Sequence, residues 1–126
     1  MRSLVMTLRM LLRLLAAALI IVGIMLWTGH GSMTTIHIQL GFALTLTLLI
    51  LVVIGAVRRV SFVPLLLGLV WVALLPALGF AQRTMMIGSS HWIVRVGHLL
   101  IGVAAVGLGE TIGARIVRGL PSGGTT

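Results

Sequence analysis

The stretch HIQLGFALTLTLLILVVIGAVRR, residues 37–59, determines the fold class of this chain. Between His37 and the arginine pair Arg58–Arg59 it carries 20 consecutive residues without a charged side chain. An α-helix needs about 20 apolar residues to cross the hydrocarbon core of a bilayer. The stretch therefore predicts a transmembrane helix with a histidine near one end and two arginines at the other.

Other apolar runs of comparable length precede and follow this stretch. We predict spans at about residues 10–27, 34–57, 60–82 and 92–114, joined by short polar connectors. Of the 126 residues, 60% are hydrophobic and 8% are charged, and a soluble domain could not bury that much apolar surface. The expected fold is an all-α membrane protein, a four-transmembrane-helix bundle built from two tandem helical hairpins. We predict one domain, residues 1–126, with a disordered tail at 119–126.

The arginines predict how the bundle is oriented in the membrane. The net charge of +8 comes from nine arginines, there is no lysine, and Glu110 is the only acid. All but Arg83 and Arg95 fall on the side of the termini and of the 58–59 turn. The positive-inside rule then predicts both termini inside (N-in/C-in), in a bacterial-type cytoplasmic membrane. Membrane anchoring explains the basic charge, so we expect no nucleic-acid partner. The four histidines would face the exterior: His30, His37, His91 and His98.

Two matched motifs on the second and fourth helices are the candidate site. HIQLG (37–41) and HLLIG (98–102) each place a glycine four residues after a histidine, and they start 61 residues apart. In tandem hairpins such equivalent residues face each other across a pseudo-two-fold axis. Two facing imidazoles can provide both axial ligands of haem b, while Gly41 and Gly102 leave room for the macrocycle. The alternative is that His37 and His98 pair with polar neighbours and bind no metal.

Residues around these motifs have more than one interpretation. Arg95 is a candidate partner of the haem propionates, with Arg83 as a second candidate, because Arg binds carboxylates well. The alternative is that Arg95 simply extends its charge to water. His30 and His91 could hold a second haem, donate hydrogen bonds to the first site, or be solvated. One haem is therefore expected, and a second haem stays open.

Two features near the other side of the membrane predict helix–helix contacts. Glu110 is expected to form a structural ion pair with Arg115 or with the Arg58–Arg59 turn. Gly109 and Gly113 form a close-packing face for another helix, from this chain or from another subunit.

The chain also resembles a known family of haem proteins. Its second helix, its third helix LLLGLVWVALLPALGF and its fourth helix HWIVRVGHLLIGVAAVGLG resemble helices of one half of haem A synthase. The arrangement is equally similar to small four-helix b-type cytochromes and to membrane cytochrome subunits of bacterial redox enzymes. The resemblance covers about residues 34–112 and implies that His37 and His98 are the axial pair. The first outer loop lacks the acidic residue and the cysteine pair expected of the synthase. The resemblance therefore implies haem binding rather than synthase activity.

Together these observations predict a membrane b-type haem protein that transfers single electrons through a bis-histidine haem near the outer face. A bis-histidine iron has no open position, which favours an electron-transfer protein over a stand-alone enzyme. The expected partners are the lipid bilayer, the other subunits of a redox complex and a quinone. The main alternative is a cofactor-free accessory or scaffold subunit of a larger membrane complex. A small transporter is a weaker alternative, because no acid lies near the histidines.

Overall fold

The computed structural model describes residues 1–121, and this part of the chain contains four long helices and no strand. They are α1 (Arg2–Trp27), α2 (Thr34–Val57), α3 (Phe62–Ala81) and α4 (His91–Arg118), and a short 3-10 helix, η1 (Gly31–Met33), precedes α2. All four long helices are long and apolar enough to cross a membrane. The prediction of an all-α four-helix bundle is confirmed, and the chain is a multi-pass membrane protein. The tail predicted at 119–126 lies mostly outside the described residues.

Two helix boundaries differ from the predicted spans. The helix α1 begins at Arg2, well before the predicted span at 10–27, and α4 continues to Arg118, beyond the predicted end at 114. Residues 2–9 contain neither Pro nor Gly, and they bury Val5 and Leu8 against the bundle. A count of apolar residues locates only the part inside the hydrocarbon core, whereas the packed helix extends past the interface.

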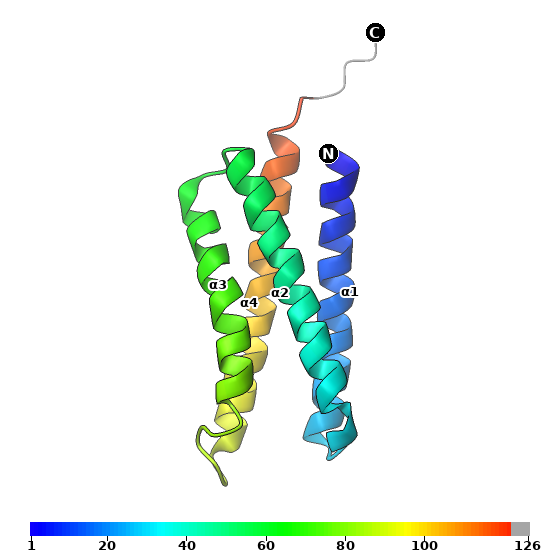
Figure 1. The fold of residues 1–126 in the computed structure, drawn as a ribbon, viewed down its shortest axis with the longest axis vertical. Coiled ribbons are helices and arrows are strands. Elements are labelled where there is room, and N and C mark those ends of the chain that lie inside the picture. Colours follow the sequence, from blue (N-terminus) through cyan, green and yellow to red (C-terminus); the bar gives the residue numbers. More distant parts are fainter. Residues whose placement is uncertain (122–126) are drawn as a thin grey trace.

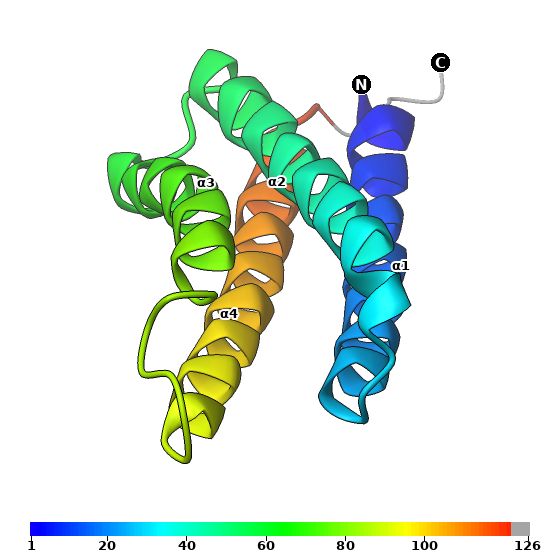
Figure 2. The ribbon, with the colours of Figure 1, turned by 60° about the horizontal axis from the view of Figure 1, so that its bottom comes forward.

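The helices run up and down, so that both termini lie at one end of the bundle (Figure 1). We call this the terminal end, and we call the other end, which carries the α1–α2 and α3–α4 connectors, the connector end. Neighbouring helices contact one another around the bundle, and α2 and α4 also touch across its centre. Within residues 1–121, α1 and α3 make no contact. The ribbons of α1 and α2 diverge from that of α4 toward the connector end (Figure 2).

The tightest packing lies toward the terminal end. The most buried large side chains are at most 1% exposed and come from α1, α2 and α4: Val5, Leu12, Leu48, Leu51, Ile112 and Ile116. A Cβ atom at Gly109 would clash with Leu12, and one at Gly113 would lie 2.7 Å from Cδ of Arg9. The predicted close-packing face of Gly109 and Gly113 therefore packs on α1 of the same chain.

An ion pair also joins α1 to α4 near the terminal end. Glu110 accepts hydrogen bonds from Nη2 of Arg9 at 2.6 Å and from Nη2 of Arg13 at 2.7 Å. The prediction that Glu110 pairs with Arg115 or with the 58–59 turn is wrong. Arg115 instead donates a hydrogen bond to the hydroxyl of Ser61. Arg9 and Arg13 are one turn apart on the helix that packs beside Glu110. Charged hydrogen bonds of this kind satisfy a carboxylate that would otherwise be costly inside a span.

A single tryptophan links α3 to α4 in the middle of the bundle. The indole Nε1 of Trp71 donates a hydrogen bond of 3.0 Å to the backbone carbonyl of Ile101. Ile101 lies one turn from His98 on α4, so this bond holds α3 against α4 close to that histidine.

Candidate functional site

His37 and His98 lie side by side in the connector half of the bundle. They stand on α2 and α4, the two helices that meet across the centre, and their ring centroids are 6.2 Å apart with an interplanar angle of 49°. Both side chains are partly buried. The structure thus brings together the two histidines that the sequence paired.

Each ring also carries a buried nitrogen without a partner. Nδ1 of His37 and Nδ1 of His98 are the two buried side-chain nitrogen or oxygen atoms that lack a hydrogen bond within residues 1–121. A buried polar group without a hydrogen bond costs about 1–3 kcal/mol. A buried group of this kind is usually explained by a bound water, an ion or a functional role.

The separation of the rings matches that of two axial ligands. A metal–nitrogen bond is about 2 Å, and a ring nitrogen lies about 1 Å from the ring centre, so two axial imidazoles have centres about 6 Å apart. No group of three or more His, Cys, Asp or Glu side chains comes together within residues 1–121. An iron that takes its other four ligands from a porphyrin needs only two histidines from the protein.

Two glycines that the sequence analysis missed face the imidazoles. A Cβ atom at Gly23 of α1 would lie 3.6 Å from Cε1 of His37, and one at Gly79 of α3 would lie 3.9 Å from Cε1 of His98. Each histidine is therefore met by a glycine from the preceding helix of its own hairpin. The tandem pattern of the sequence could have identified these two glycines, because each hairpin has a glycine near the connector end of its first helix.

The predicted glycines have a different environment. A Cβ atom at Gly41 or at Gly102 would meet nothing within 4 Å. Both lie one turn from their histidine toward the middle of the bundle, and neither is packed against a neighbouring helix.

The other two histidines lie at the connector end, His30 in the α1–α2 connector and His91 at the first residue of α4. Nδ1 of His30 lies 3.2 Å from the carbonyl of Met25, and Nδ1 of His91 lies 3.1 Å from the carbonyl of Met85. A protonated Nδ1 would donate to each carbonyl, which leaves Nε2 as the nitrogen with the free lone pair. The α1–α2 connector and the start of α4 lie apart in Figures 1 and 2. The structure does not bring His30 and His91 together.

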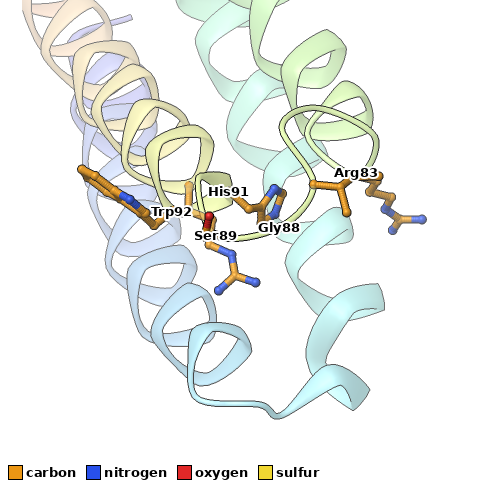
Figure 3. Close-up of a pocket in the computed structure, with 7 residues that line it drawn as sticks. Arg83, Gly88, Ser89, His91 and Trp92 are labelled. Atoms are coloured by element: carbon orange, nitrogen blue, oxygen red, sulfur yellow. The ribbon is translucent and has the colours of Figure 1, made fainter.

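Arg83 and Arg95 line an open pocket at the connector end. Its volume is about 450 Å³, and Gly88, Ser89 and His91 also contribute to its wall (Figure 3). The guanidinium carbon of Arg95 lies 5.9 Å from the ring centroid of Trp27, across from α4 to α1. In Figure 3 the side chain of Arg83 points away from Ser89. The two arginines share one pocket, and Arg95 is the one that reaches from α4 to Trp27 of α1.

Comparison of the chain with protein-family models, with curated proteins and with solved structures finds no match.

Proposed function

We propose that this chain is a membrane b-type haem protein whose iron is held by His37 and His98. The observation that carries the proposal is the meeting of two imidazoles in an apolar bundle, 6.2 Å apart and each with a buried, unpartnered nitrogen. Axial ligation of haem inside a helical bundle needs little else from the protein. Gly41 and Gly102 support it, because the space beside them is open.

The chemistry of this site is electron transfer. A haem, when bound, supplies an iron that gains and loses one electron at a time. His37 and His98 would both hold the iron, and a bis-histidine iron has no open position for oxygen or a substrate. Single-electron transfer is therefore the activity that these residues favour.

Arg95 is the residue that we propose as the propionate partner. It lies three residues from His98 on α4, on the side of the connector end. The only acid of the chain, Glu110, is already bound by Arg9 and Arg13. Arg95 therefore has no carboxylate to neutralise it from within residues 1–121, and Arg83, in the same pocket, is the second candidate. The α1–α2 connector, which carries His30, lies apart from the start of α4, which carries His91, so we propose one haem rather than two.

The setting that we propose is a bacterial-type cytoplasmic membrane, with the termini inside and the haem toward the exterior. The distribution of arginines supports this orientation, since most of them lie toward the terminal end. The electron partners that we propose are a membrane quinol and the other subunits of a redox complex.

Optical spectra of the purified chain test the proposal. The full-length protein in detergent should show a Soret band, and reduction with dithionite should bring out sharp α and β bands. We expect His37→Ala and His98→Ala each to lose this spectrum. The control is His91→Ala, which removes a histidine from the same helix as His98 and should leave the bands unchanged.

The same experiment tests the main alternative. A chain that folds as a stable bundle but takes up no haem would contradict the proposal and favour the accessory or scaffold subunit. Far-ultraviolet circular dichroism of each variant separates loss of haem from loss of the fold.

A further inference from the structure

Trp27 of α1 and Arg95 of α4 lie one turn from the histidine pair, on the side of the connector end. On α1, Trp27 comes four residues after Gly23, where a Cβ atom would lie 3.6 Å from Cε1 of His37. On α4, Arg95 comes three residues before His98. Residues three or four apart in a helix share a face and lie one above the other. Both residues therefore lie one turn outward from the layer that His37 and His98 form.

These two side chains meet across the bundle. The guanidinium carbon of Arg95 lies 5.9 Å from the ring centroid of Trp27. A guanidinium at this distance is attracted by the face of the indole ring. The ribbons of α1 and α4 diverge toward this end (Figure 2), and a long side chain and a large ring bridge the two helices there.

The end of α1 attracts Arg95 as well. Trp27 is the last residue of α1, and the last turn of a helix carries a partial negative charge. This helix has no basic residue of its own in that turn. Within residues 1–121 no carboxylate competes for Arg95, because Glu110, the only acid of the chain, is bound by Arg9 and Arg13.

Both residues can also be reached from the connector end. Trp27 is 48% exposed, and Arg95 is exposed and lines the open pocket of about 450 Å³. A ligand that arrives from this end meets Trp27 and Arg95 before it meets the imidazoles one turn further in. A single contact between an exposed cation and a ring is weak, so it can open without unfolding the bundle.

We propose that Trp27 and Arg95 form a lid over the histidine pair, and that a ligand reaches the two imidazoles from the connector end when their contact opens. The link between the lid and haem rests on the proposed function, in which Arg95 leaves the ring of Trp27 to bind a propionate. Binding of the ligand and opening of the lid would then involve the same side chain.

Chemical labelling of the histidines in the haem-free chain tests the proposal. Diethyl pyrocarbonate reacts from water with an imidazole nitrogen that has a free lone pair, and peptide mass spectrometry measures the rate at each histidine separately. The sample is the full-length protein in lipid nanodiscs, produced without haem.

The variants that open the lid are Arg95→Gln and Trp27→Leu. Their matched controls are Arg83→Gln and Trp92→Leu, which replace the same residue types at the connector end but leave the contact of Arg95 with Trp27 in place. Both lid residues are exposed, so we expect each variant to fold, and either one alone decides the test.

We expect His37 and His98 to react about fivefold faster in each lid variant, which corresponds to about 1 kcal/mol, the strength of an exposed cation–π contact. The rate at His30, in the α1–α2 connector, should stay unchanged. Arg95→Lys keeps the cation and should react at nearly the native rate. The double variant should react no faster than either single variant, because both remove the same contact.

Three results would overturn the proposal. They are native rates at His37 and His98 in the lid variants, an equal increase in the controls, and a double variant in which the two increases multiply.

The labelling distinguishes this proposal from the proposed function, because it uses protein without haem. Faster labelling in the lid variants of a chain that takes up no haem would support the lid and refute the haem proposal. Native rates in the lid variants of a chain that does take up haem would refute the lid alone.

Discussion

The two ends of the bundle use glycine in opposite ways. Toward the terminal end, a Cβ atom at Gly55 or Gly68 would lie 2.8 Å or less from a side chain of a neighbouring helix. In the connector half, Gly41 and Gly102 would meet nothing within 4 Å. In the terminal half glycine lets helices approach closely, which is how transmembrane helices gain packing energy. In the connector half it leaves space around two histidines. The difference shows that the terminal half is the more closely packed of the two, and our proposal places the ligand in the other half.

The largest expected effect comes from filling a glycine of the packed half. A leucine at Gly109→Leu must displace Leu12, Leu48 and Leu51, which a Cβ atom there already contacts. We expect it to lower the free energy of unfolding by about 3 kcal/mol, because overpacking a tight core forces strained rotamers. The measurement is unfolding in mixed detergent micelles.

The matched variant in the open half is Gly102→Leu. We expect it to change the free energy of unfolding by less than about 0.5 kcal/mol, since no packed neighbour must move. It should nevertheless reduce haem content. Equal destabilisation by the variants at positions 102 and 109 would contradict the distinction between the two halves.

The next largest effect is expected from the ion pair of the packed half. Glu110→Gln leaves Arg9, whose side chain is 19% exposed, without a carboxylate. We expect a loss of about 2 kcal/mol in the free energy of unfolding, the range for hydrogen bonds to charged groups. Arg13 is 53% exposed, so Arg13→Gln should cost much less. Detergent unfolding curves of the two variants check the order, and an equal or larger loss in Arg13→Gln would contradict it.

A smaller effect is expected at the border between the two halves. Trp71→Phe removes the indole hydrogen bond to the carbonyl of Ile101 while it keeps an aromatic ring in place. We expect it to lower the free energy of unfolding by about 1 kcal/mol. Trp92→Phe, at the exposed connector end, is the control and should have no measurable effect. A larger loss at position 92 than at position 71 would show that the indole bond does not hold α3 to α4.

The smallest effect on stability, with a clear effect on the site, is expected from the glycines that face the imidazoles. Gly79→Leu would push the ring of His98 from its position, because even a Cβ atom there comes within 3.9 Å of Cε1. We expect haem content to fall at least about tenfold, with a smaller loss in the free energy of unfolding than in Gly109→Leu, because only the imidazole must move. Gly79→Ala adds only an ordinary contact and should keep its haem. A leucine variant with full haem content would show that this glycine does not position His98.

The sequence was sufficient for the four spans and for the pairing of His37 with His98. Apolar length locates a membrane helix, and the tandem spacing matches the histidines. The sequence could not show which helix provides the partners of Glu110, or which helices contact the two imidazoles. In a membrane both the lipid-facing and the packed faces of a helix are apolar, so periodicity does not reveal which face of α1 meets α4. The contacts of Gly23, Gly79 and Arg9 emerge only from the three-dimensional packing.

The measurement that tests the central claim most directly is electron paramagnetic resonance of the oxidised, full-length protein at low temperature. Two strong-field imidazoles on one ferric iron produce a low-spin signal, and the account predicts this signal in the native chain. In both His37→Ala and His98→Ala it should be replaced by a high-spin signal or be lost with the haem, while His91→Ala keeps it. A native chain without a haem signal, or a low-spin signal that survives in the variant at position 37 or 98, would contradict the claim.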